Sequence, residues 1–273
     1  MTRHAKTLRL IEAAAAILAE HNPMTVRQVY YQLVSRQVIE NSRSCYQSVS
    51  KALVAARREG TIPWEWIEDR LRKPRRVAMW SSLAEFCDPD LYRRDVWPTQ
   101  PSLLECWLEK DALSGIFDDV LDPYGVTLNV GRGYDGWDSI HNAAERYGSG
   151  ESASVIYFGD FDPSGEDMVR SLTERLATFG CRPEIVKCAL TADDVRRYAL
   201  PPDFTKKTDS RRAKFVAKHG DIAVELDALP NQVLRDRLVE EVESRMDLDA
   251  LAVAHKKDAA ERERLQTLVE GLS

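Results

Sequence analysis

The 273-residue sequence predicts an α/β protein in which a small helical domain precedes a parallel sheet covered by helices. Two observations predict this fold class. Up to residue 76, apolar residues recur at the spacing of amphipathic helices, whereas from residue 102 short apolar runs alternate with amphipathic segments. We therefore expect a first domain at 1–76, a connector at 77–101 and a second domain at 102–273.

The composition excludes several classes of protein. Hydrophobic residues make up 44% of the chain, which argues against wholesale disorder. Neither a secretory signal nor an apolar run of the roughly 18 residues needed to cross a bilayer is recognisable, so we expect a cytoplasmic protein without a membrane partner. The five cysteines form no C-x-x-C pair and are expected to be reduced thiols.

The formal net charge of −6 is unevenly distributed. Residues 1–76 contain 14 Lys and Arg against 7 Asp and Glu, whereas residues 77–273 contain 24 against 37. Chance can scatter charge in this way in any two-domain protein. The alternative is a basic module that faces DNA, joined to a domain rich in carboxylates.

The first domain is expected to begin with a helix at 5–20, and a second helix is expected to follow Thr25, its plausible N-cap. The core stripe of that second helix consists of Val26, Val29, Tyr30 and Leu33. Tyr31 lies off this stripe and shares its face with Arg27, one turn earlier. Tyr31 either covers the edge of the core with its hydroxyl in water, or has a function.

A third helix is expected at 43–58. Its inward residues are Tyr46, Val49, Leu53 and Ala56. Its other faces carry the polar residues Arg43, Gln47, Lys51, Arg57 and Arg58. A turn with Trp64 and Trp66 follows, so the domain fits a winged helix-turn-helix whose third helix enters a major groove. The basic run at 70–76 could contact phosphates, or form a solvated surface.

The second domain reads as alternating strands and helices. Strands are expected at 103–108, 126–130, 154–159, 184–188 and 222–226. Helices are expected at 110–121, 137–147, 164–179, 230–245 and 248–271, after a helical connector at 77–92. This order predicts a parallel sheet with helices on both faces, and the last two helices could serve dimerisation.

Acidic residues follow two of these strands. Glu109 ends the first strand, and Asp160 and Asp162 end the third. Ligands of parallel sheets gather at the carboxyl ends of strands, and convergent carboxylates suit Mg²⁺. The alternatives are a turn with a helix N-cap for the two aspartates, and an ordinary surface ion pair for Glu109 and Lys110.

Other motifs carry less information. The glycine turn at 131–136 could bring Arg132 near a phosphate, or it could be a plain turn. A P-loop and an H-E-x-x-H motif are absent from the sequence. The five histidines are scattered, so imidazole-based metal binding or general-base chemistry has no particular support.

Four segments together resemble a known family. LEKDA at 108–112, GRGYD at 131–135 and FGDFDPSG at 158–165 resemble the Toprim domain of topoisomerase VI A subunits and their meiotic double-strand-break relatives. TVRQVYY at 25–31 resembles the segment of that family that carries the nucleophilic tyrosine, although Gln28 replaces an acidic residue. The length is that of a small, free-standing bacterial or phage relative.

This resemblance implies a winged helix plus a Toprim-like α/β domain. It implies that Tyr31 is the nucleophile, that Arg27 supports it, and that Glu109 acts both in catalysis and in metal binding. The implied Mg²⁺ ligands are Glu109, Asp160 and Asp162. The residues then expected to contact DNA are Arg43, Lys51, Arg57, Arg58, Lys110 and Arg132.

The implied activity is Mg²⁺-dependent cleavage of double-stranded DNA through a 5′-phosphotyrosyl intermediate, by a nucleoid-associated protein. In the family, the tyrosine of one protomer works with the metal site of the other, which implies a homodimer that makes two staggered cuts. The sequence shows no ATPase module, so strand passage would need a separate ATPase subunit. Two alternatives remain: a Toprim nuclease that hydrolyses DNA or RNA with metal-activated water, and a winged-helix DNA-binding protein without catalysis.

Overall fold

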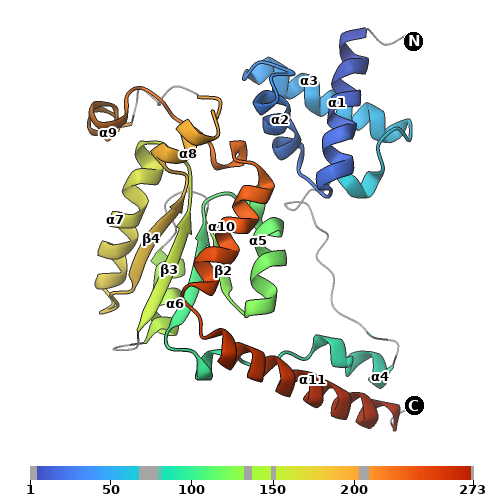
Figure 1. Ribbon diagram of the computed structural model, residues 1–273, viewed down its shortest axis with the longest axis vertical. Coiled ribbons are helices and arrows are strands. Elements are labelled where there is room, and N and C mark those ends of the chain that lie inside the picture. Colours follow the sequence, from blue (N-terminus) through green and yellow to red (C-terminus); the bar gives the residue numbers. More distant parts are fainter. Residues whose placement is uncertain are drawn as a thin grey trace.

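The computed structural model describes residues 5–67, 80, 82–131, 137–148, 152–202 and 209–271. It confirms an α/β protein, in which an N-terminal helical region precedes a four-stranded, all-parallel sheet of order β2-β1-β3-β4 (Figure 1). Within the described residues, we find no helix with the length and apolar character needed to cross a membrane.

The head, defined as residues 5–67, contains α1 (Ala5–His21), α2 (Val26–Ser35) and α3 (Arg43–Arg58). Thr25 begins α2 as predicted: its hydroxyl accepts the Gln28 amide at 3.2 Å, and the Gln28 side chain accepts the Thr25 amide at 2.7 Å. Ser42 caps α3 in a similar way. The buried core of the head includes Ile17, Leu18, Val29, Leu33, Val49, Leu53 and Ala56.

Of the wing expected after α3, the described residues extend only to residue 67. The short helical turn Trp64–Trp66 is followed by one isolated bridge, in which Ile67 lies parallel to Met24. Residues 59–67 contain no β-hairpin, and the basic run at 70–76 lies outside the described residues. Tyr46, expected inward, remains 36% exposed because its ring packs edge-on against Tyr30 at the rim of the core.

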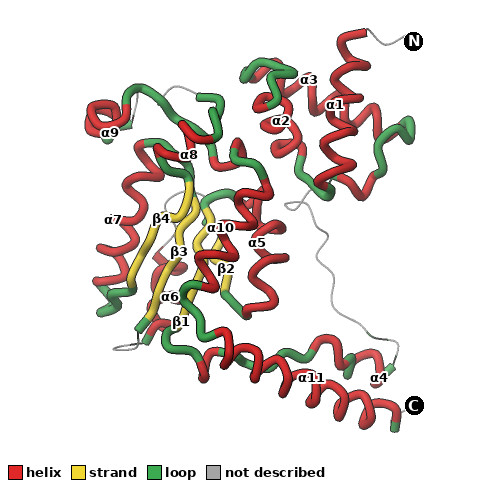
Figure 2. The backbone as a smooth tube through the Cα atoms, in the orientation of Figure 1, coloured by secondary structure: helices red, strands yellow, loops and turns green. Residues whose placement is uncertain are grey.

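The sheet belongs to the body, defined as residues 103–271. Its strands are β1 (Leu103–Leu108), β2 (Thr127–Val130), β3 (Ala153–Phe158) and β4 (Glu184–Ala189). The crossover helices are α5 (Ser114–Leu121), α6 (Trp137–Tyr147) and α7 (Pro163–Ala177). These four strands and three helices confirm the predicted alternation, and Figure 2 shows the strands lying between helices.

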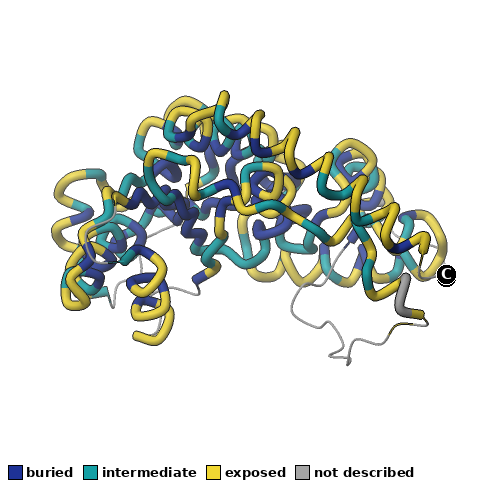
Figure 3. The backbone as a smooth tube through the Cα atoms, turned by 90° about the horizontal axis from the view of Figure 1, so that it is seen from below, coloured by how far each residue is buried: buried dark blue, intermediate teal, exposed yellow. Residues whose placement is uncertain are grey.

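The two faces of the sheet have separate cores because side chains alternate along each strand. Leu104, Cys106 and Leu108 pack with α5 and with α10 (Asn231–Glu243) on one face. Trp107 and Tyr157 pack with α6 and α7 on the other. Burial therefore follows the strands and the inward sides of the helices, whereas the C-terminal helix is largely exposed (Figure 3).

Two predicted elements are wrong. The expected strand at 222–226 contributes a single bridge, between Val224 and Phe161, before a short helical turn at Leu226–Ala228. Val224 and Leu226 are buried in the core cluster, whereas Ile222 is exposed. In the described part of the expected helical connector, the helical elements are α4 (Leu83–Phe86) and the turn Pro89–Leu91; helix is disfavoured at the residue before Pro89.

The remaining helices lie beyond the sheet. They are α8 (Ala192–Arg197), α9 (Arg212–His219) and α11 (Leu248–Glu270). The connector lies along α11, where the Tyr92 hydroxyl donates to Glu261 at 2.7 Å and Arg94 pairs with the same carboxylate at 2.5 Å. The C-terminal helix is thus joined to the connector between head and body (Figure 1).

A buried charge in β1 provides a test of this packing. Glu105 is fully buried and accepts hydrogen bonds from Arg146 Nε at 2.5 Å and from the Tyr147 hydroxyl at 2.9 Å. Arg146→Met leaves this carboxylate without its cation and should lower the free energy of unfolding by about 3 kcal/mol in urea titrations. Arg170→Met, which removes an ion pair on the surface of α7, is the control and should leave the free energy of unfolding unchanged. Equal losses of free energy in the two variants would refute this account.

Candidate functional site

The predicted carboxylates gather at the carboxyl ends of β1 and β3. Glu109 follows β1, and one of its oxygens, Oε2, accepts the Asp160 amide at 3.0 Å. The Tyr157 hydroxyl donates to the same oxygen at 3.0 Å. Glu109 and Asp160 are therefore brought together as the strand order predicts, and neither is part of an ordinary surface ion pair.

Asp162 has a structural role as well. Its Oδ1 accepts the Gly165 amide at 2.7 Å, so Asp162 is the N-cap of α7. This is the alternative expected for a D-x-D sequence before a helix. Asp160 is held from another direction, because its Oδ1 accepts the Leu226 amide at 2.8 Å.

Two lysines lie among these carboxylates. Lys110 Nζ is 2.8 Å from Asp160 Oδ2 and 3.2 Å from Glu225 Oε2. Lys187, on β4, donates to the Asp160 carbonyl at 2.8 Å. Lys110 was expected to contact DNA; in the structure its ammonium instead neutralises the acids at the strand ends.

The head brings Arg27 to the same place. Arg27 Nε lies 2.9 Å from Asp227 Oδ2, and its Nη2 pairs with Glu225. The guanidinium also lies 5.4 Å from the centre of the Tyr31 ring. Helix α2 packs against the turn at 226–228, so the nucleophile predicted in the head and the acids predicted in the body meet within one chain.

The predicted exposure of Tyr31 is wrong. Tyr31 does lie beside Arg27, away from the hydrogen bond between the Tyr30 hydroxyl and Asn41, but only 9% of Tyr31 is exposed. The helical wheel placed Tyr31 off the core stripe, whereas the structure packs it in the buried core of the head, with its ring 5.1 Å from that of Tyr30. Among the described residues, none forms a hydrogen bond with the Tyr31 hydroxyl.

Burial and charge oppose ionisation of Tyr31 in this state. Burial raises the pKa of Tyr31 well above its usual range, and the nearby Asp227 and Asp160 raise it further. The Arg27 guanidinium acts in the opposite direction but does not compensate. Burial also raises the pKa of Glu109, and the repulsion from Asp160 and Asp162 adds to it.

Among the described residues, carboxylates outnumber cationic side chains at the site. The carboxylates are Glu109, Asp160, Asp162, Glu225 and Asp227, and the cations are Arg27, Lys110 and Lys187. Asp227 is buried, and its Oδ1 has no hydrogen-bond partner among the residues that the structure describes. Hard oxygen donors with excess negative charge suit Mg²⁺.

A preformed metal site is nevertheless not present. No three His, Cys, Asp or Glu side chains in the described part of the chain are arranged to hold a metal ion. Asp160 has one oxygen on the Leu226 amide and the other on Lys110. The Mg²⁺ site at Glu109, Asp160 and Asp162 therefore stays a prediction, and it requires Lys110 to move.

The other residues predicted to bind DNA fall into three groups. Arg43, Lys51 and Arg58 are exposed on α3. Arg57 instead stabilises the head: it donates to the carbonyls of Trp64 and Ile67 at 2.8 and 3.1 Å. Arg132 and its glycine turn lie outside the described residues.

Sequence reasoning missed Glu225, Asp227 and Lys187. Glu225 and Asp227 are two residues apart after an apolar run, which is the same spacing that drew attention to Asp160 and Asp162. That signal was available in the sequence. Lys187 gave no comparable signal, because a single lysine within a strand is common at sheet edges.

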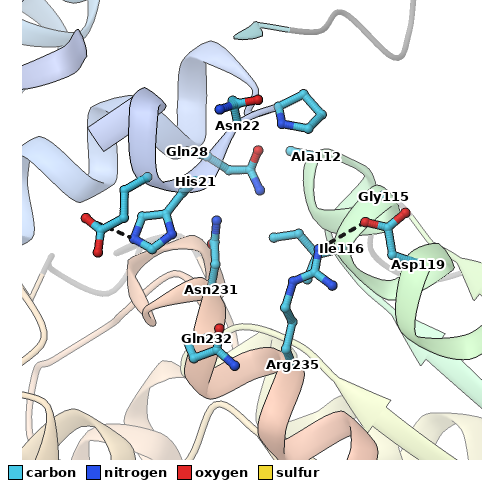
Figure 4. Close-up of a pocket in the computed structure, with 12 residues that line it drawn as sticks. His21, Asn22, Gln28, Ala112, Gly115, Ile116, Asp119, Asn231, Gln232 and Arg235 are labelled. Atoms are coloured by element: carbon cyan, nitrogen blue, oxygen red, sulfur yellow. Dashed lines mark hydrogen bonds and ion pairs between the residues drawn. The ribbon is translucent and has the colours of Figure 1, made fainter. Parts of the chain in front are cut away.

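A polar groove of about 210 Å³ lies beside this contact, between head and body (Figure 4). His21 and Asn22 line it from the end of α1, and Asp119 and Arg235, 2.9 Å apart, line it from α5 and α10. The groove lies between the end of α1 in the head and helices α5 and α10 in the body. The head contacts the body mainly through α2.

Comparison with known proteins gives no family. None of the protein-family models matches the sequence, and a search of curated proteins finds no similar protein. Function must therefore be inferred from the site itself.

Gly159 tests the close packing of the site. A Cβ atom there would lie 2.2 Å from the Tyr157 hydroxyl and 2.7 Å from Glu109 Oε2. Gly159→Ala should displace Glu109 and lower the free energy of unfolding by about 1–3 kcal/mol. Gly271→Ala, where the nearest atom is 3.3 Å away, is the control; if both variants unfold like the wild type in urea, the packing at Glu109 is not as described.

Proposed function

We propose that this protein cleaves DNA by Mg²⁺-dependent tyrosine transesterification, as the resemblance to topoisomerase VI A subunits implies. One observation carries the proposal: Arg27, beside Tyr31 on α2, pairs with Glu225 and Asp227, and the Leu226 amide between these two residues donates to Asp160 at the end of β3. A nucleophile, a cation for the phosphate and oxygen ligands for a metal are thereby close together.

The reaction exchanges one phosphodiester for another. The Tyr31 hydroxyl oxygen forms a bond to phosphorus, and the bond between phosphorus and the 3′ oxygen breaks. The phenol loses its proton and the leaving 3′ oxygen gains one. The products are a 5′-phosphotyrosyl link and a free 3′-hydroxyl, and the break can be resealed without ATP.

The residues around Tyr31 have distinct roles. Asp227 and Glu225 hold two nitrogens of Arg27, which orients the guanidinium next to Tyr31. Arg27 could then bind a phosphate oxygen and favour the phenolate. When bound at Glu109, Asp160 and Asp162, Mg²⁺ would stabilise negative charge on the phosphoryl group and the 3′ oxygen.

The head is proposed to hold double-stranded DNA as a winged helix-turn-helix. The exposed Arg43, Lys51 and Arg58 of α3 support this, because phosphate contacts come chiefly from such side chains. The homodimer, the separate ATPase subunit and the nucleoid location belong to the same proposal.

Hydrolysis by metal-activated water is the second candidate. It is favoured by the burial of Tyr31 and by the raised pKa of its hydroxyl. Burial raises the pKa of Tyr31, and Arg27 is already neutralised by Asp227 and Glu225. Under this candidate, water attacks the phosphodiester and Tyr31 is a packing residue of the head.

Covalent trapping distinguishes the two candidates. Wild-type protein, Mg²⁺ and supercoiled plasmid, quenched with detergent, should give protein attached to 5′ ends, and Tyr31→Phe should abolish both attachment and cutting. Tyr30→Phe, the control, loses the hydrogen bonds from the Tyr30 hydroxyl to Asn41 and to the Ser42 carbonyl, and should still cut. A Tyr31→Phe variant that cuts normally would establish hydrolysis instead.

A second variant tests the metal ligands. Asp160→Asn should abolish Mg²⁺-dependent cutting while duplex binding by the head, measured by fluorescence anisotropy, is retained. If the wild type binds duplex DNA but neither nicks it nor attaches to it, the protein is a DNA-binding protein without this activity.

A further inference from the structure

We infer that Tyr157 is a positioning residue for the cleavage reaction: its hydroxyl commits the Oε2 atom of Glu109 to the protein and leaves Oε1 for a ligand. This role deepens the proposed function and rests on it, because Glu109 is a metal ligand only under that proposal. The contacts concerned lie within the body, at the ends of β1 and β3.

Tyr157 is a buried side chain that ends in a polar group. It is 3% exposed and belongs to the core between the sheet and helices α6 and α7, with Trp107, Met168 and Leu172. Phenylalanine would fill such a position, and a buried hydroxyl without a partner is destabilising. Among the described residues, the acceptor of this hydroxyl is Glu109 Oε2, at 3.0 Å. The hydroxyl therefore favours one orientation of the Glu109 carboxylate.

The hydrogen bonds that the described residues donate to Glu109 end on the same oxygen. The Tyr157 hydroxyl and the Asp160 amide each donate to Oε2 at 3.0 Å. Within the described part of the chain, Oε1 accepts no hydrogen bond and forms no ion pair. Carboxylates that bind metals are typically hydrogen-bonded in turn, which orients them. One oxygen of Glu109 is thus held by the protein, and the other remains available to a metal ion.

The packing around this hydrogen bond requires glycine at position 159. A Cβ atom there would lie 2.2 Å from the Tyr157 hydroxyl and 2.7 Å from Glu109 Oε2. Gly159 is itself fixed, because its amide donates to the Ala189 carbonyl at 2.8 Å and its carbonyl accepts the Leu190 amide at 2.7 Å. The backbone at the ends of β3 and β4 thereby keeps Tyr157 and Glu109 in contact.

The competing explanation is that Tyr157 is a core residue whose hydroxyl uses the nearest acceptor. Tyr147 provides a matched comparison, because it is similarly buried in the same core and its hydroxyl donates to another carboxylate, Glu105, at 2.9 Å. Glu105 lies within β1 and not at its carboxyl end. Removal of either hydroxyl takes one donor from a carboxylate, but only Tyr157 acts on the proposed site.

Metal binding by two variants distinguishes these explanations. Tyr157→Phe and Tyr147→Phe are first shown by urea titration to fold, and each is then titrated with Mn²⁺, with the free ion measured by electron paramagnetic resonance. Tyr157→Phe should weaken Mn²⁺ binding about tenfold or more, since loss of a group that orients a metal ligand costs about 10–100-fold in affinity. Tyr147→Phe should bind Mn²⁺ like the wild type. Equal affinities in the two variants would overturn the inference.

Amide hydrogen exchange provides a readout that needs neither metal nor DNA. The Asp160 amide donates to the oxygen that Tyr157 holds, so it should exchange about fivefold faster in ¹⁵N-labelled Tyr157→Phe than in the wild type. The Gly159 amide, which donates to the Ala189 carbonyl, is the internal control and should be unchanged. An unchanged Asp160 amide, or equal acceleration of both amides, would show that Tyr157 does not position Glu109.

The two measurements separate this role from the proposed function. A wild type that binds no Mn²⁺ would contradict the metal ligands of the proposed function, and exchange of the Asp160 amide would still decide whether Tyr157 positions Glu109. A wild type that binds Mn²⁺ but leaves DNA intact would contradict cleavage, while weaker binding by Tyr157→Phe would still support the positioning of Glu109.

Discussion

The contact of Arg27 with Asp227 and Glu225 is the interaction on which the rest of this structure depends. It crosses from the head to the body and pairs a half-exposed guanidinium with a fully buried carboxylate. Without it, the parallel sheet would still bring Glu109 and Asp160 together at its carboxyl edge. With it, the helix that carries Tyr31 lies at that edge too, so one contact unites a basic domain and an acidic domain in a single site.

Under the proposed function, the surroundings of this contact would keep Tyr31 protonated in the absence of substrate. Arg27 lowers the pKa of Tyr31, but burial and the neighbouring Asp227 and Asp160 outweigh this effect. Lys110 meanwhile lies against Asp160, where a metal ligand is expected. A DNA phosphate would compete with the carboxylates for Arg27, and a divalent cation would compete with Lys110. Under the proposed function, activation would consist of exchanging internal ion pairs for substrate and metal.

The sequence predicted the local parts of this arrangement better than the tertiary ones. Strand β1 and helix α3 have their expected bounds, because periodicity and capping residues are local signals. Glu109 and Asp160 converge because strand ends meet at one edge of a parallel sheet. The burial of Tyr31 could not be read from a helical wheel, since Tyr31 packs in the buried core of the head although it lies off the core stripe of its helix. Glu225 and Asp227 were missed because the sequence around them resembles a strand. In the structure this segment forms one bridge and then turns toward the site.

The most direct measurement is the chemical identity of the link between protein and DNA. After reaction with Mg²⁺ and plasmid, the protein is digested with nuclease and protease, and its peptides are analysed by mass spectrometry. The account predicts a nucleotide phosphate on the peptide that contains Tyr30 and Tyr31, with fragment ions that place it on Tyr31. Cleaved DNA with 5′-phosphates and an unmodified Tyr31 peptide would contradict it.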